Sequence, residues 1–403
     1  MATIRNQWSV FQRLIGMCLL AALMSGLYMC GSGGSSGVSS STQAGDPLIS
    51  VNQTRSSGAG SDMDGSSSSS LSSSTGSSGG SAGVSSGALS PTPASFPSSD
   101  HVFVIMLENQ GYSQVFSAGG ATSCSSSGMP NLCTLAAANG VALHFYANNH
   151  GSLLSYLFST SGANWKGKPY DCTGSACATA GVIKGDNIVR ALNNANKTWR
   201  GYFEGMPVCG YMGGSSGNYT THHNPFKWYS DVADSTNDQQ GNMCPFTQLG
   251  VDLGQNALPN FGYIVPNLRD DAEGTGTQSA SALLSTADKW IKTNIGPGPG
   301  TLLSSAPFQP GGDGILIVTF DESRVAGKSG NKSSDDACSP TKSSGCGGHV
   351  AFVMIGPNVI ARSTASATYH FQDMLHTILH LLGISDYMNG ANGAADIALL
   401  PGA

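Results

Sequence analysis

The sequence contains few charged side chains, and basic residues are the scarcer kind. Charged residues make up 10% of the 403 residues, with 18 Lys and Arg against 24 Asp and Glu, for a formal net charge of −6. A nucleic-acid-binding surface needs clustered Lys and Arg, which this composition does not supply. We therefore expect no nucleic acid among the partners of the protein.

Long apolar runs are also scarce. One run, from about Leu14 to Met29, follows Arg5 and Arg13, an order typical of a bacterial export signal. No later run is long enough to cross a bilayer. We predict an export signal over residues 1–30, and membrane contact only through this amino-terminal anchor.

The end of this signal resembles a lipoprotein cleavage box, Leu27–Gly31, with Cys30 as the lipidated residue. Met29 stands where such a box normally has a small residue. Lipidation at Cys30, simple secretion and an uncleaved anchor all stay open. The expected location is outside the cytoplasm, as a cell-surface lipoprotein or a secreted protein.

Large apolar residues are nearly missing from residues 31–99, which consist mostly of Ser, Gly, Ala and Thr. Such a segment cannot offset the entropy cost of ordering, so we predict a disordered linker there. The remaining residues, 100–403, are enough for one large α/β domain.

The sequence has no C-x-x-C pair, and its cysteines lack histidines at zinc-finger spacing, which disfavours a structural zinc site. Eight of the 10 cysteines lie beyond the export signal, and in an exported chain closely spaced pairs indicate disulfides. The pairs expected from proximity are Cys124–Cys133, Cys172–Cys177, Cys209–Cys244 and Cys338–Cys346.

Two apolar segments end abruptly on oxygen-bearing side chains. Val102–Leu107 reads as a strand buried on both faces and is followed by Glu108 and Asn109. Gly314–Phe320 repeats the arrangement and is followed by Asp321-Glu322. Ligands gather at the carboxyl ends of strands in open α/β sheets, so both pairs are candidate metal ligands.

Other segments have the periodicity of strands and helices. The further strands expected are Val141–Ala147, Trp199–Phe203, Phe261–Val265 and Val350–Ile355; the helices are Asn131–Asn139, Asp186–Asn194, Ser279–Thr293 and a last one containing Phe371, Met374, Leu375, Ile378, Leu379 and Leu382.

Ser152 lies just before an apolar helical segment that contains Leu153 and Phe158. A hydroxyl at a helix start is most often only a cap. The same place suits an activated nucleophile, because the unpaired amides and the positive dipole end favour an alkoxide and phosphoryl oxygens.

Several histidines compete for a functional role. Pro225 prevents a regular helix through His222-His223, and we expect only one of these two, His223, to be functional. His349 directly precedes the predicted strand Val350–Ile355. The pair His376 and His380 lacks the glutamate of an H-E-x-x-H pattern, so it is interpreted as surface or packing residues.

These carboxylates, the hydroxyl and the histidines form a set that phosphate-ester hydrolysis can use. A Ser/His/acid triad is the competing use of the same residue types. It is disfavoured because the sequence contains no G-x-S-x-G motif, and Gly151-Ser152 is followed by Leu-Leu-Ser.

The order of motifs from about His101 to Leu382 resembles the bacterial phosphoesterase family that includes secreted acid phosphatases and phospholipases C, relatives of the alkaline-phosphatase superfamily. The motifs are Glu108-Asn109, His150-x-Ser152, Asn187-Ile188-Val189, Trp199-x-x-Tyr202-x-Glu204-x-Met206-Pro207, His223-Asn224-Pro225-Phe226, Pro266-Asn267-Leu268, Phe320-Asp321-Glu322, Gly347-Gly348-His349 and Gly356-Pro357. The resemblance implies a central, mainly parallel sheet flanked by helices.

The resemblance also implies roles. Ser152 would be the nucleophile that becomes phosphorylated, with His223 and His349 as phosphate or metal contacts and proton donors. One divalent metal ion, with the presence of a second left open, would be held by Glu108, Asn109, Ser152, Asp321 and Glu322. The expected partner is a phosphorylated small molecule or a phospholipid headgroup.

The chain departs from the family pattern at two positions. Ser155 replaces an asparagine of the pattern H-P-S-x-P-N-Y, and Glu273 stands where a histidine is usual. The leading expectation is an acid-phosphatase-type phosphomonoesterase. The alternatives are a phospholipase C-type phosphodiesterase and a tethered binding protein that has lost catalysis.

Overall fold

The computed structural model describes residues 95–117, 120–122, 124–165, 181–235, 239–324, 334–342 and 346–403. The predicted export signal, almost all of the predicted linker and the predicted Cys172–Cys177 bridge lie outside these residues, so they stay predictions. Within the described ranges, no helix combines the length and apolarity needed to span a membrane.

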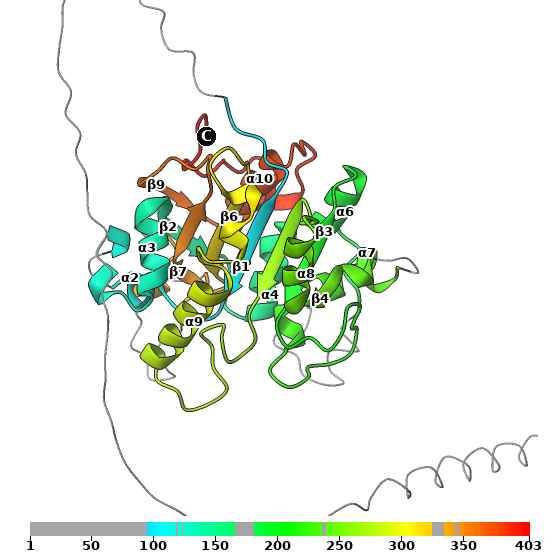
Figure 1. Ribbon diagram of the computed structural model, residues 1–403, viewed down its shortest axis with the longest axis horizontal. Coiled ribbons are helices and arrows are strands. Elements are labelled where there is room, and N and C mark those ends of the chain that lie inside the picture. The colour runs from blue at the N-terminus through cyan, green and yellow to red at the C-terminus, as the bar shows by residue number, and fades with distance from the viewer. Residues whose placement is uncertain are drawn as a thin grey trace, which may run out of the picture. The chain divides into compact units, whose positions relative to one another are not determined.

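The described residues build one sheet with helices on both faces (Figure 1). Its order is β4-β3-β5-β1-β6-β8-β2-β7, with β9 added beside β2. The strands are β1 (Val102–Leu107), β2 (Gly140–Ala147), β3 (Trp199–Phe203), β4 (Met243–Pro245), β5 (Phe261–Val265), β6 (Ile315–Phe320), β7 (Gly348–Val350), β8 (Phe352–Ile355) and β9 (Ser363–Tyr369).

The centre of the sheet is parallel and fully buried. β1 lies between β5 and β6 and runs parallel to both, and each residue of β1 and β6 is buried. Continuous apolar sequence suits this environment, because helices cover both faces of the strands. Among the described strands, the antiparallel pairs are β2 with β7, β2 with β8 and β6 with β8. The prediction of a mainly parallel α/β sheet is confirmed.

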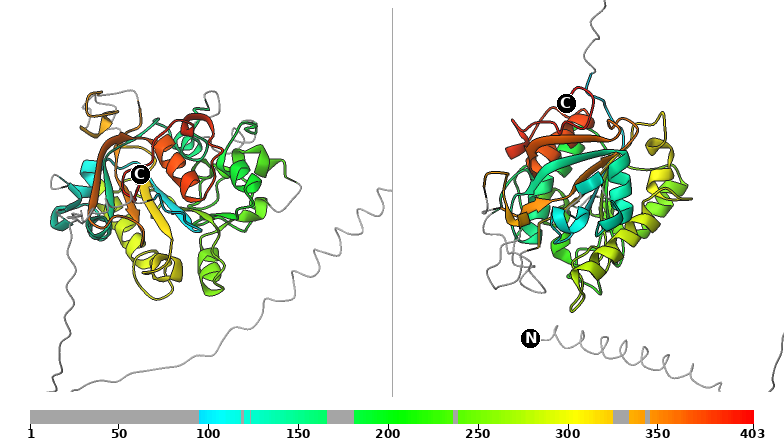
Figure 2. Two further views of the ribbon diagram at one scale, coloured as in Figure 1. Left: turned by 90° about the horizontal axis from the view of Figure 1, so that it is seen from above. Right: turned by 90° about the vertical axis from the view of Figure 1, so that its left-hand side faces the viewer.

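Two pairs of helices pack on opposite faces of the sheet (Figure 2). α4 packs against α10 on one face, and α3 packs against α9 on the other. The helices are α2 (Tyr112–Phe116), α3 (Pro130–Ala138), α4 (Ser152–Ser161), α6 (Ile188–Asn194), α7 (Ser230–Ala233), α8 (Thr247–Gly254), α9 (Ala280–Asn294) and α10 (Phe371–Leu381).

The expectation of one strand over Val350–Ile355 is wrong. Two strands occupy this region, and His349 lies within β7 instead of before a strand. The break arises because β7 pairs with the end of β2, whereas β8 pairs with the start of β2 and with β6. The sequence reading also missed α8, β4 and β9, the last of which is Ser/Thr/Ala-rich and largely exposed.

Three of the predicted disulfides are confirmed within the described residues. Their pairings are Cys124–Cys133, Cys209–Cys244 and Cys338–Cys346. The first joins the segment before α3 to α3 itself, and the third closes the loop that precedes β7.

A substitution at Gly262 of β5 tests how tightly the centre of the sheet is packed. Gly262 pairs with Phe103 of β1, and a Cβ atom there would lie 2.2 Å from the Phe103 ring. We expect Gly262→Ala to lower the free energy of unfolding by roughly 1–3 kcal/mol through overpacking. Chemical denaturation of wild type and variant measures the change.

Gly250→Ala is the matched control. Gly250 lies exposed in α8, and nothing within 4 Å would meet its added Cβ. Because alanine favours the helix, this variant should gain up to about 1 kcal/mol. Equal stability changes at the two glycines would contradict the packing argument.

Candidate active site

Three strands, β1, β6 and β2, bring Glu108, Asp321 and Ser152 to one edge of the sheet. Glu108 and Asn109 follow β1, Asp321-Glu322 follow β6, and Ser152 begins α4 soon after β2 ends. Backbone hydrogen bonds fix the register of this edge. The Asp321 amide donates to Leu107 O at 2.9 Å, and the Glu108 amide donates to Asp271 O at 2.8 Å, which adds the loop after β5.

Asp321 is held by the two neighbouring segments. Its Oδ1 accepts from the backbone amides of Asn109 at 2.9 Å and Glu322 at 2.7 Å. Asn109 has a φ of 52°, a left-handed conformation that asparagine tolerates better than most residues. The other oxygen, Oδ2, is buried and has no hydrogen-bond partner among the described residues.

Ser152 is the first residue of α4, and its hydroxyl does not cap the helix. Gly151 precedes it with a φ of 104°, a conformation that glycine adopts at no steric cost. The Ser152 Oγ instead donates to Glu108 Oε2 at 3.0 Å, and the Asn109 side-chain amide donates to the same oxygen at 3.1 Å. The hydroxyl thus faces the carboxylates at the positive end of a helix.

Glu322 joins the segment before α4 to the same edge. Its Oε1 accepts from the Gly151 amide at 3.0 Å, and its Oε2 contacts His150 Nδ1. The hydrogen bond to Glu322 raises the pKa of His150, against the opposing effect of burial. His150 therefore neutralises part of the negative charge and fixes the turn that presents Ser152.

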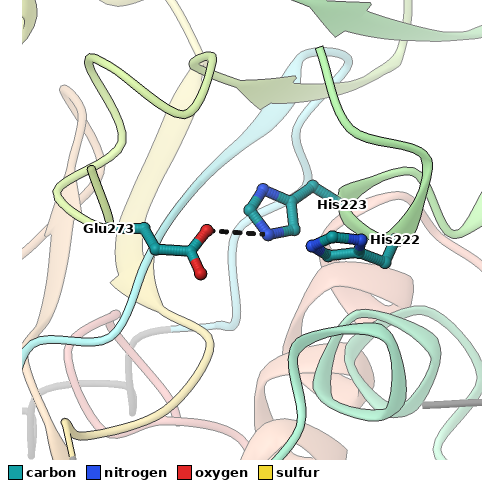
Figure 3. Close-up of side chains that lie close together, drawn as sticks. All are labelled: His222, His223 and Glu273. Atoms are coloured by element: carbon teal, nitrogen blue, oxygen red, sulfur yellow. Dashed lines mark ion pairs between the residues drawn. The ribbon is translucent and has the colours of Figure 1, made fainter. Parts of the chain in front are cut away.

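His223 lies among three carboxylates, and its side chain is only 3% exposed. Its Nε2 is 3.2 Å from Glu108 Oε1 and 3.5 Å from Glu273 Oε2, while Nδ1 is 3.5 Å from Asp271 Oδ2. Figure 3 shows the Glu273 carboxylate pointing toward His223, with the His222 ring edge-on beside it. The His223 ring also stacks on Tyr156 of α4, with ring centroids 5.3 Å apart.

The acids at this edge repel one another in a dry environment. Burial, and then the charge of Asp321, raises the pKa of Glu108 well above its ordinary value. Burial, and then the charge of Glu322, raises the pKa of Asp321, and burial raises the pKa of Asp271. Buried carboxylates in close contact strongly favour a bound cation or bound protons.

His349 has a different set of contacts. Its Nε2 lies 2.8 Å from Leu143 O, and its ring stacks between Tyr112 and Tyr146 at 4.4 and 4.8 Å. Its Nδ1 lies 3.8 Å from Asp335 Oδ1, and burial lowers its pKa. These contacts do not join it to Ser152, so its catalytic role stays a prediction.

Asp271 is the main site residue that the sequence reading missed. No sequence motif marks Asp271 as a site residue, but it is fully buried, and the neighbouring Glu273 Oε2 lies 3.5 Å from His223 Nε2. Asp271 Oδ1 accepts from the Glu273 amide at 2.8 Å. The available signal was its place in the loop that follows strand β5, although Asp271 lies several residues beyond Val265 whereas Glu108 directly follows β1.

A profile of the phosphoesterase family matches residues 122–385, well over half of the chain. The chain belongs to the phosphoesterase family. The predicted family is thus confirmed, and so is the predicted enzyme class at the level of the family, hydrolases of phosphate esters.

Named relatives of this phosphoesterase are distant. A probable acid phosphatase of Kluyveromyces lactis is 25% identical over 232 residues, 56% of this chain and 48% of the relative. An acid phosphatase of Aspergillus fumigatus is 28% identical over 202 residues, 48% of this chain and 40% of the relative. A phosphatidylinositol-3-phosphatase of Mycobacterium tuberculosis is 24% identical over 233 residues, 57% of this chain and 65% of the relative.

Solved structures similar to this phosphoesterase include an alkaline-phosphatase-superfamily protein from Vibrio parahaemolyticus, with 16% identity and a TM-score of 0.47 over 74% of this chain and 71% of that one. The lipoteichoic acid synthase LtaP of Listeria monocytogenes has 12% identity and a TM-score of 0.47, over 76% and 78% of the two chains.

The buried acids predict how the stability of the metal-free phosphoesterase depends on pH. In the unfolded chain, carboxyl groups have pKa values near 4. The pKa values of Glu108, Asp271 and Asp321 are raised in the fold, so above about pH 4 the folded protein binds more protons than the unfolded chain. The free energy of unfolding should therefore fall as pH rises through this window.

Thermal melts in chelator across this pH range test the prediction. We expect Asp321→Asn to flatten the fall in Tm, because the variant lacks one of the repelling charges. Asp386→Asn, at an exposed position, should keep the wild-type slope. A wild-type Tm that rises over the same pH range would contradict the burial of these acids.

Proposed function

We propose that this chain is an extracytoplasmic, metal-dependent phosphomonoesterase of acid-phosphatase type that acts through a phosphoserine at Ser152. The observation that carries the proposal is the hydrogen bond from Ser152 Oγ to Glu108 Oε2, inside a buried group of acids at a helix start. The acid-phosphatase names of the relatives from Kluyveromyces lactis and Aspergillus fumigatus support the substrate class.

The side chains present fit a divalent cation. Asp321 Oδ2 is a buried carboxylate oxygen with no hydrogen-bond partner in the described part of the chain. Together with the side chains of Glu108, Asn109, Ser152 and Glu322, it supplies the hard oxygen ligands that such ions prefer. A cation bound there would lower the pKa of the serine hydroxyl and offset charge on the phosphoryl oxygens.

In the proposed first step, Ser152 Oγ attacks the phosphorus of a phosphomonoester. An Oγ–P bond forms, the bond from phosphorus to the alcohol oxygen breaks, and the hydroxyl proton passes to Glu108 Oε2, its acceptor in the structure. The positive end of the α4 dipole would stabilise the phosphoryl oxygens. Water then cleaves the phosphoserine, releasing phosphate and restoring the hydroxyl.

The leaving alkoxide needs a proton. His223 is the donor favoured by position, because its Nε2 lies 3.2 Å from Glu108 Oε1 and its ring is fixed by stacking on Tyr156. Asp271 beside Nδ1 would hold the ring in one orientation, as a carboxylate does for a catalytic histidine. His349 stays in the proposal as a phosphate contact inferred from the family pattern alone.

The location outside the cytoplasm is supported by two features. The apolar segment from about Leu14 to Met29 has the layout of an export signal. The disulfides Cys124–Cys133, Cys209–Cys244 and Cys338–Cys346 would persist in an oxidising compartment.

Ser152→Ala tests the nucleophile. Because the variant lacks the attacking oxygen, we expect turnover of p-nitrophenyl phosphate to fall by roughly a thousandfold or more. The matched control is Ser159→Ala on the same helix, whose hydroxyl is buried and contacts Tyr156 O and Tyr263 Oη. A Ser152→Ala variant as active as wild type would rule out the mechanism.

Metal removal tests the cation. Turnover of p-nitrophenyl phosphate should be lost in chelator and return when magnesium, calcium, manganese or zinc is restored one at a time. Asp321→Asn should regain little activity at the same metal concentration, because one ligand oxygen is lost. Undiminished turnover by the chelator-treated wild type would refute metal dependence.

A panel of substrates separates the phosphomonoesterase from its alternatives. The name of the Mycobacterium tuberculosis relative adds phosphatidylinositol 3-phosphate to the panel. Release of inorganic phosphate from monoesters supports the proposal, whereas release of phosphocholine from phosphatidylcholine would assign the phospholipase C type. Binding of phosphorylated ligands without any turnover would instead indicate a protein that has lost catalysis.

A further inference from the structure

A second group of metal-ligating side chains lies outside the proposed active site. It consists of His376 and His380, one turn apart on α10, and Asp396 from the segment after that helix. One ligand atom from each residue lies within 4.8 Å of the others. None of the three belongs to the site built around Ser152, although α10 packs against α4 on the face of the sheet opposite α3 and α9.

The two imidazoles are already oriented. His376 Nδ1 lies 2.9 Å from Ala391 O. If Nδ1 donates its proton to this carbonyl, the lone pair that can bind a metal is on Nε2. A backbone carbonyl in this role is the usual support of a metal-binding histidine. Tyr387 stacks on His376 with centroids 4.1 Å apart, and Phe96 stacks on His380 at 3.8 Å with an interplanar angle of 3°.

The backbone on both sides of Asp396 is hydrogen-bonded to α10. The amide of Ala395 donates to Asp373 Oδ1 at 3.2 Å, and the amide of Ile397 donates to Thr377 Oγ1 at 3.0 Å. Both acceptors are side chains of α10, so the residue between them, Asp396, faces the helix at the level of the two histidines. The segment is therefore held in place before any ion binds.

One oxygen of this carboxylate lacks a partner. Asp396 Oδ1 is buried with no hydrogen bond to any described residue, and it lies 3.8 Å from His376 Nε2. That distance is too long for a hydrogen bond. It is close to the roughly 3.4 Å expected between two ligands of one tetrahedral ion bound at about 2.1 Å. The other oxygen, Asp396 Oδ2, lies within hydrogen-bond distance of His380 Nδ1, at 2.8 Å.

We propose that His376, His380 and Asp396 bind one zinc-class divalent transition-metal ion, which fastens the segment after α10 to the helix. Two imidazole nitrogens and one carboxylate oxygen favour zinc, cobalt or nickel over magnesium and calcium. The His380 side chain is 41% exposed, so the site opens to solvent and leaves a fourth position for water. The rival is a plain ion pair between His380 and Asp396.

Zinc content per chain tests the proposal on the full protein. The chain is stripped with chelator, reloaded with Zn²⁺ and freed of excess ion before the metal is counted. We expect Asp396→Asn and His380→Ala each to hold one zinc fewer than wild type. The matched control is His101→Ala, which lies outside both sites and whose ring Nδ1 is 3.0 Å from the Pro259 carbonyl oxygen.

The same variants are made in an Asp321→Asn background, so that loss at this site is counted separately from any cation at the active site. The difference of one zinc should persist in both backgrounds, whether or not the protein hydrolyses phosphate esters. In the Asp321→Asn background, zinc should also raise the Tm by roughly 5 °C at 100-fold excess over its Kd, and by much less once Asp396→Asn is added.

Equal zinc content in wild type, Asp396→Asn and His380→Ala would overturn the proposal and leave an ordinary ion pair. Circular dichroism of each stripped variant shows whether it folds. Asp396→Asn keeps the size of the side chain, and His380 is partly exposed, so the second variant decides the matter if the first does not fold.

Discussion

The active edge depends on one electrostatic constraint, the burial of several carboxylates in mutual contact. Glu108, Asp271 and Asp321 are fully buried and come from three neighbouring parallel strands. Parallel pairing forces the carboxyl ends of these strands to the same side, so the repulsion is built into the topology. Backbone amides and His150 offset part of the charge, and the remainder favours a cation.

Much of this arrangement could be predicted from local sequence. Uninterrupted apolar runs identified β1 and β6, and the oxygen-bearing residues directly after them were already candidate ligands. Ser152 could be placed at a helix start, although not its bond to Glu108, which joins residues far apart in the chain. The order of the motifs identified the family, and the profile match over residues 122–385 agrees.

Other features depend on tertiary contacts that periodicity does not encode. The burial of Asp271 follows from the Glu108 amide that binds its carbonyl, and nothing in the run of acids after Pro266 indicates this. The division between β7 and β8 follows from their pairing: β7 pairs with the end of β2, whereas β8 pairs with the start of β2 and with β6. The pairing of His376 and His380 with Asp396 needs the chain to turn back along α10, which an H-x-x-x-H spacing alone does not specify.

The position of β1 has a consequence for how the protein folds. Val102 pairs with Phe261 on one side and with Ile315 on the other. Both partner strands of β1 are therefore synthesised long after β1 itself. The middle of the sheet therefore cannot assemble until synthesis has passed Phe320. Such non-local pairing slows folding, so the central strands stay exposed until the last of them has been made.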